Sequence, residues 1–185
     1  MRSEFSSPLT SENLLTMRVL ISILLLGFSG NLMAQDAFIK EFQQKWKNAS
    51  EYTIEMAEVM PEDKYDFKPA DGSRTFEEQL LHMMSNMVWL SSSYLAEGSF
   101  ERDLKKKDYT KTEIIALLKE TTTFSANTIA GLTAQDLEKQ VDFFAGPMSK
   151  RQIMMLMNDH LTHHRGQIIV YLRMNGIKPP RYRGW

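Results

Sequence analysis

The segment that decides the fold runs from Ser149 to Gly176, SKRQIMMLMNDHLTHHRGQIIVYLRMNG. Apolar residues recur in it at the three- to four-residue spacing of an amphipathic helix. Asn175-Gly176 is a C-terminal cap signal, and Pro179-Pro180 prevents the helix from continuing. A helix of this length buries its apolar stripe most readily against other helices. The segment therefore predicts one long member of an all-α protein.

Three further segments upstream have helical period, and two of them open with a capping box. The first runs from about Asp36 to Met60 and is stopped by Pro61. The second spans 75–97 and the third spans 110–132; their boxes are Thr75-Phe76-Glu77-Glu78 and Thr110-Lys111-Thr112-Glu113. Residues 61–74 are rich in Pro, Asp and Gly, which predicts a loop.

Little else in the sequence competes with this helical pattern. Residues 133–139 suggest one short helical turn, and alternation of period two is confined to 141–144. Six methionines, Met83, Met84, Met87, Met154, Met155 and Met157, are expected as flexible core filler. Four long helices that bury apolar stripes against one another predict a four-helix bundle.

All four histidines of the chain lie in the second and fourth predicted helices. At 100° per residue, His160 and His164 fall on the stripe that also carries Ile153, Leu156 and Met157, so this stripe should face the core. Imidazoles at positions i and i+4 are neighbours on a helix and can bind one metal ion. His163 lies at the edge of the stripe and is not expected to be a ligand.

His82, in the second helix, would complete a three-histidine site if it faced His160 and His164. Three histidines leave one position of a zinc-like ion open, as in catalytic zinc sites. Binding should weaken as the pH falls through about 6.5, where imidazole takes up a proton. Glu78 and Asp159 are nearby candidates for a general base. The alternative is that these are core histidines satisfied by hydrogen bonds.

The N-terminal stretch 17–34, MRVLISILLLGFSGNLMA, has the order of a secretory signal. Arg18 precedes an apolar run, Val19 to Phe28, that is too short to span a bilayer, and Ala34 ends a cleavage site. We expect residues 1–34 to be a signal peptide with an upstream extension, the true start being Met17, and residues 35–185 to be the folded domain. An uncleaved anchor or a buried N-terminal helix is the alternative.

Composition narrows the classes of partner. Lys and Arg number 22 and Asp and Glu 23, so the net charge of −1 offers no general attraction for nucleic acid. The absence of cysteine excludes disulfides and thiolate metal ligands. We expect a periplasmic or secreted protein that has no membrane span after signal cleavage and binds a small molecule. A homodimer is left open.

The histidine helices and the loop before the second helix also resemble a known family. The segments YDFKPADGSRTFEEQ, EEQLLHMMSNMVWL and DHLTHHRGQIIVYLRMNGIKPP are similar to those of the DinB-like (DinB/YfiT) superfamily of metalloenzymes. The resemblance covers about residues 36–181. It implies a four-helix bundle with a crossover connection and a divalent metal, zinc or nickel, held by His82, His160 and His164. Characterised members include transferases and isomerases that use low-molecular-weight thiols. These thiols are mainly cytoplasmic, so a thiol-dependent role fits an exported protein poorly.

Two main functional hypotheses follow. The first is a metal-dependent transferase or hydrolase that acts on a small molecule at an open three-histidine site. The second is a non-catalytic, exported bundle that binds a metal or a ligand. A purely structural helical protein, whose core histidines are satisfied by hydrogen bonds, is the third hypothesis.

Overall fold

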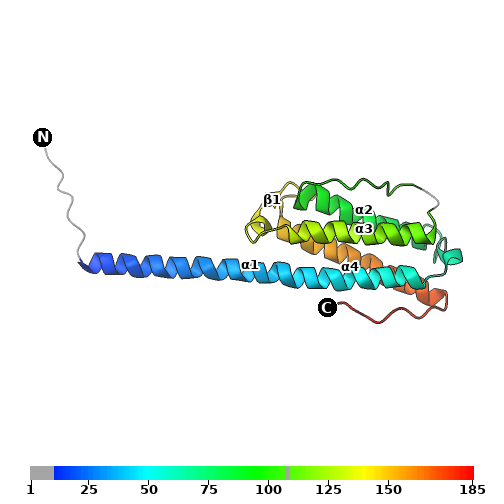
Figure 1. The fold of residues 1–185 in the computed structure, drawn as a ribbon, viewed down its shortest axis with the longest axis horizontal. Coiled ribbons are helices and arrows are strands. Elements are labelled where there is room, and N and C mark those ends of the chain that lie inside the picture. Colours follow the sequence, from blue (N-terminus) through cyan, green and yellow to red (C-terminus); the bar gives the residue numbers. More distant parts are fainter. Residues whose placement is uncertain (1–10, 107–108) are drawn as a thin grey trace.

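A computed structural model describes residues 11–106 and 109–185 and shows a mostly helical protein (Figure 1). The side chains of the N-terminal helix are described at 15–20, at 22 and from 37 onward. The elements in chain order are α1 (Ser11–Val59), η1 (Glu62–Lys64), α2 (Phe76–Leu90), η2 (Ser91–Leu95), α3 (Lys111–Ala130), η3 (Asp136–Glu138), β1 (Gln140–Val141), β2 (Met148–Ser149) and α4 (Lys150–Met174).

The first helix is longer than the sequence predicted. It ends at Val59, next to the predicted stop, but it begins at Ser11 rather than near Asp36. No proline occurs between Pro8 and Pro61, so nothing in the chain removes a backbone donor and breaks the helix. The N-terminal half of α1 projects away from the other helices (Figure 1).

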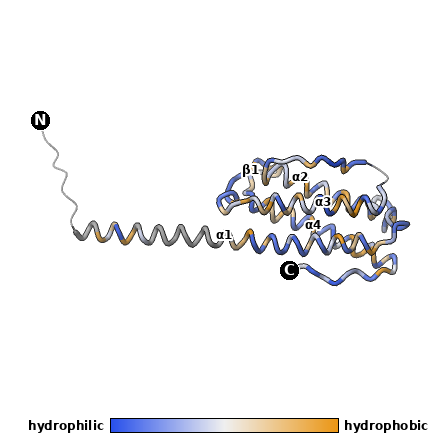
Figure 2. The backbone as a smooth tube through the Cα atoms, in the orientation of Figure 1, coloured by the Kyte–Doolittle hydropathy of each residue, from blue (hydrophilic) through white to orange (hydrophobic). Residues whose placement is uncertain are grey.

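The helices α1 to α4 pack around one hydrophobic core, and we call residues 38–177, which contain it, the helical body. Within it, α1 contacts α3 and α4, and α2 contacts the same two helices. Residues 96–106 run back along the outside of the helices, so α2 and α3 point in the same direction (Figure 1). Hydrophobic and hydrophilic residues alternate along each helix of the body (Figure 2), as the helical period requires.

Both predicted capping boxes are confirmed. The Thr75 side chain accepts a hydrogen bond from the Glu78 backbone N–H, and the Glu78 carboxylate accepts one from the Thr75 backbone N–H. Thr110 and Glu113 make the same pair of bonds at α3. Ser149 caps α4 in the same way, with Gln152 in place of a glutamate.

Large side chains fill the core as the sequence predicted. Met155 is the exception among the six methionines, with 51% of its surface exposed, because it faces away from the core on α4. The largest buried side chains, each less than 2% exposed, include Trp46, Phe76, Met56, Met60, Leu80, Met83, Met84, Met87 and Leu90.

Short elements join α3 to α4. The predicted turn at 133–139 is present as η3, and β1 pairs with β2 as a two-stranded antiparallel ladder with Gln140 opposite Ser149. Among the helices whose side chains are described, none combines the length and the apolar character of a membrane span.

Candidate metal centre

Three histidines from two helices converge at the α2–α4 contact. The Nε2 atoms of His82 and His160 lie 3.1 Å apart. The His164 ring centroid lies 4.5 Å from that of His82 and 4.4 Å from that of His160. One ring nitrogen of each residue falls within 4.8 Å of the other two. The structure thus brings together the three residues that the sequence singled out.

The local helical geometry explains this convergence. His160 and His164 are one turn apart on α4 and therefore project from the same face. The same face carries buried Met157 and Ile168, which pack into the core. His82 lies on α2, which packs directly against α4. Two packed helices are sufficient to build the cluster.

Two glutamines hold the His164 ring. Its Nδ1 lies 3.0 Å from Gln79 Oε1 and 2.9 Å from Gln167 Oε1, so the Nδ1–H donates toward two acceptors. The Gln79 amide nitrogen in turn donates to Gln167 Oε1 at 2.8 Å and lies 3.3 Å from the Tyr171 hydroxyl. With the proton on Nδ1, the lone pair of His164 is on Nε2. Hydrogen bonds of this kind fix the tautomer of metal-binding histidines.

The electrostatic environment keeps the three imidazoles neutral. Burial, followed by the charge of Arg74, lowers the pKa of His82 to about 4. Burial together with the neighbouring histidines lowers the pKa of His160 to about 4. Burial also lowers the pKa of His164, against an opposing contribution from Gln167. A neutral imidazole is the form that binds a metal.

The donor set suits a divalent cation of the zinc type. Imidazole nitrogen is a preferred ligand of zinc, copper and nickel. Three nitrogen donors, one of them supported by amide acceptors, match the pattern of three protein ligands found in catalytic zinc sites. The three histidines therefore form a cluster compatible with metal binding.

The remaining candidates lie outside this cluster. His163 is exposed, and its Nε2 lies 3.0 Å from the Gln167 amide nitrogen. Glu78 accepts the hydrogen bond that caps α2, so its carboxylate has a structural task. Asp159 is exposed. Of the aromatic residues near the histidine helices, Tyr171 and Phe143 are buried, whereas Trp89 and Phe144 are exposed.

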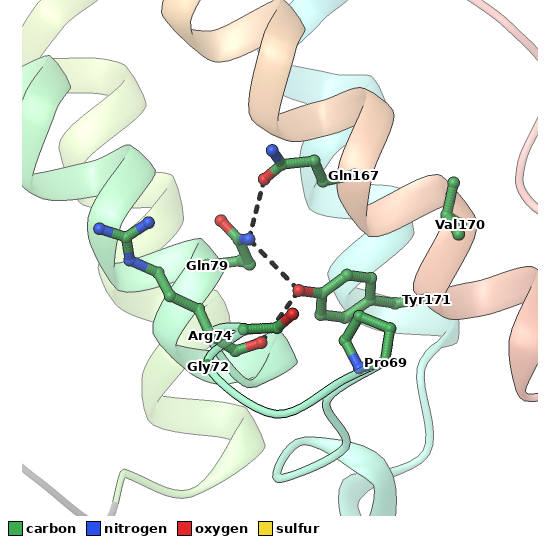
Figure 3. Close-up of a pocket in the computed structure, with 8 residues that line it drawn as sticks. Pro69, Gly72, Arg74, Gln79, Gln167, Val170 and Tyr171 are labelled. Carbon is green, nitrogen blue, oxygen red and sulfur yellow. Dashed lines mark hydrogen bonds between the residues drawn. The ribbon is translucent and has the colours of Figure 1, made fainter.

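A cavity of about 660 Å³ adjoins the cluster through the two glutamines that hold His164 (Figure 3). Its wall includes the loop before α2 and the last turns of α4. Tyr171 links these two elements, because its hydroxyl on α4 donates a hydrogen bond to the Arg74 carbonyl oxygen in the loop, at 2.9 Å. The lining residues are Pro69, Gly72, Ser73, Arg74, Gln79, Gln167, Val170 and Tyr171.

Gln79 and Arg74 are functional candidates that no motif in the sequence marks. Gln79 lies three residues before His82, a spacing that places both on one face of α2, and this was the available signal. Arg74 lies in a loop, where helical period carries no information. Gln167 and Tyr171 lie on the stripe of His160 and His164, but their hydrogen bonds depend on the packing of α2 and therefore on tertiary structure.

Comparisons with known proteins agree with the fold and with the family that the sequence resembles. The model of the DinB family matches residues 33–184. The uncharacterized protein YjoA of Bacillus subtilis (strain 168) is 29% identical over 127 residues, which are 67% of this chain and 82% of that protein.

Two solved structures share the fold. A DinB-like protein from Bacillus cereus ATCC 10987 superposes with a TM-score of 0.69 at 23% identity, over 77% of this chain and 96% of the other. The DinB-like protein YjoA from Bacillus subtilis superposes with a TM-score of 0.64 at 21% identity, over 78% and 99%.

Proposed function

The chain belongs to the DinB family, and from this premise we propose that it is a metal-dependent enzyme acting on a small molecule by transfer or hydrolysis. His82, His160 and His164 are the proposed ligands of a divalent cation, zinc or nickel. The observation that carries the proposal is the convergence of their ring nitrogens within 4.8 Å. The adjoining cavity supplies room for a small molecule.

Each residue near the cluster has a distinct task in this proposal. His82 and His160 present Nε2 atoms toward each other, and His164 presents the nitrogen that its glutamine partners leave free. Gln79 and Gln167 orient His164 by accepting hydrogen bonds from its Nδ1–H. A cation bound by the three histidines supplies Lewis acidity, which polarises a bound group or lowers the pKa of water.

The proposal extends to architecture and location. We propose that the helical body is a four-helix bundle with a crossover, which the shared direction of α2 and α3 supports. We also propose that residues 1–34 are a signal peptide and that the mature protein is periplasmic or secreted. The exposure of Val19 and Leu20, away from the core, is in keeping with removal of this segment.

A non-catalytic metal- or ligand-binding protein is the second candidate. The cap role of Glu78 favours it, because the carboxylate nearest in sequence to His82 already accepts a backbone hydrogen bond. This candidate shares the three-histidine site with the first and differs only in whether a bound molecule is converted.

Metal analysis with matched variants tests the proposal. Protein purified without a metal-affinity column should contain about one zinc or nickel per chain, as three ligands of one site require. His82→Ala, His160→Ala and His164→Ala should each abolish tight binding, and His163→Ala should leave it unchanged. The loaded protein is then screened against small esters, amides and electrophiles with and without thiols. Equal binding by all four variants would refute the site, and binding without turnover would favour the second candidate.

A further inference from the structure

We infer that Arg74 forms an anion-recognising subsite beside the three-histidine cluster and that the small molecule bound there carries a carboxylate. This inference rests on the proposed function, since it places a recognition group next to that site. Its evidence is independent of the histidines, because it comes from the loop before α2 and from the cavity that this loop borders.

Arg74 lines the cavity that adjoins the three-histidine cluster. It lines the cavity together with Gln79 and Gln167, the two residues that hold His164. In Figure 3 its guanidinium lies on the side of Gln79 away from Tyr171. Arg74 therefore borders the same cavity as the two glutamines that position His164.

The backbone that carries Arg74 is held in place from both sides. Tyr171 on α4 donates its hydroxyl proton to the Arg74 carbonyl oxygen at 2.9 Å. The next residue, Thr75, is the N-cap of α2 and is tied to Glu78. Two residues earlier, Gly72 turns the chain with a φ of +78°, a conformation that favours glycine. A loop held this firmly presents its side chain at a defined place, as recognition requires.

The charge of Arg74 is available for a ligand. The side chain is exposed, and no carboxylate in the described part of the chain forms an ion pair with it. A guanidinium presents paired N–H donors that match the two oxygens of a carboxylate. Arg74 is the one cationic residue in the cavity lining, next to the neutral polar side chains of Ser73 and Gln167. The two oxygens of a planar carboxylate match the paired N–H donors of this one guanidinium, and the neutral donors beside it can add hydrogen bonds.

The other residues that line the cavity indicate what the rest of the ligand looks like. Pro69, Val170 and the Tyr171 ring offer apolar surface, and the volume of about 660 Å³ fits a small organic acid. Such an acid can place its carboxylate at Arg74 and extend a second polar group toward the histidines. The inferred ligand is therefore a short organic acid with a reactive group a few bonds from its carboxylate.

Calorimetric titration of the full chain tests this inference without an activity assay. The probes are succinate, which carries a second carboxylate, and acetate, which carries one. Zinc-loaded wild-type protein should bind succinate more tightly than acetate. Arg74→Gln should weaken succinate binding about tenfold or more, because it removes a charge-assisted pair of hydrogen bonds. Arg74→Lys should give an intermediate loss, since it keeps the charge but not the paired donors.

Lys68→Gln is the matched control. It removes one positive charge from the same loop at an exposed residue that does not line the cavity, so succinate affinity should stay at the wild-type value. Equal succinate affinity in wild type and Arg74→Gln would overturn the inference. So would phosphate binding that is tighter than succinate binding and lost in Arg74→Gln, because the subsite would then prefer phosphate.

Zinc titrations separate this result from the proposed function. Arg74→Gln should bind zinc at least as tightly as wild type, since a repelling charge is gone. If wild type bound no zinc but metal-free protein bound succinate through Arg74, the metal proposal would fail and the anion subsite would stand. If zinc bound normally and no probe depended on Arg74, the subsite would fail and the metal proposal would stand.

Discussion

The Nδ1 atom of His164 has two acceptors within hydrogen-bond distance, and Gln79 is the one contributed by the opposite helix. Replacing Gln79 with Ala removes that acceptor, so Gln167 on the same helix is left as the one acceptor for the ring among the described residues. We expect zinc affinity to fall about 10- to 100-fold, the usual effect of removing a partner of a metal ligand. Competition with a chromophoric chelator measures the change.

Two further variants show whether the acceptor itself is responsible. Gln79→Glu keeps an oxygen toward Nδ1 and should restore most of the affinity. Tyr171→Phe removes the hydroxyl near Gln79 but leaves both acceptors of His164 in place, so its effect should be smaller. Wild-type affinity in Gln79→Ala would contradict the positioning role.

The lowered pKa values of His82 and His160 make the stability of the metal-free protein depend on pH. In the unfolded chain these two imidazoles are protonated as the pH falls through about 6.5. In the folded chain they are protonated only near pH 4. Between these values the unfolded state binds more protons, so the folded state should lose stability as the pH falls. Urea unfolding of metal-free protein at about pH 7.5 and about pH 5 checks the sign.

The histidine variants also serve as controls for this pH effect. His82→Gln combined with His160→Gln should remove much of the pH dependence, because the amide does not titrate. His163→Gln should retain it. Equal pH dependence in wild type and in the double variant would assign the effect to other groups.

At the scale of elements, the two threonine capping boxes provide a matched pair. Thr75→Ala and Thr110→Ala should each lower the free energy of unfolding by about 1 kcal/mol, because each leaves a backbone donor without its acceptor. Only Thr75→Ala should also weaken succinate binding, since Thr75 follows Arg74 directly. Urea unfolding and calorimetric titration measure the two effects. A loss of succinate affinity in Thr110→Ala of the same size would show that general destabilisation is the cause.

The sequence predicted these elements well where a local signal exists. The boxes at Thr75 and Thr110 mark helix starts, and Gly176, with a φ of +72°, marks the end of α4. Helical period on α4 alone placed His160 and His164 on one face. The start of α1 could not be predicted from a local signal, because the apolar run that resembles a signal sequence is equally compatible with a continuous helix. The roles of Gln79 and Arg74 depend on contacts between α2, its preceding loop and α4, which no single segment encodes.

At the scale of the whole molecule, the structure divides α1 into two parts with different surroundings. From Ile39 onward its side chains enter the core, and Trp46 and Met56 are almost fully buried. Leu15, Val19 and Leu20 are more than half exposed, and this end of the helix projects away from the helical body (Figure 1). Among the α1 side chains that the structure describes, those that enter the core all follow the predicted cleavage site.

A chain that begins at Gln35 should consequently keep the fold and the metal site. We expect its midpoint of thermal unfolding to lie within about 4 °C of the full chain, which corresponds to a change of about 1 kcal/mol or less. Its zinc stoichiometry should equal that of the full chain, because the proposed ligands lie on α2 and α4. Calorimetry and metal analysis make the comparison. A shortened chain that unfolds or fails to bind zinc would show that the projecting helix belongs to the fold, and the proposal of a removable signal peptide would then fail with it.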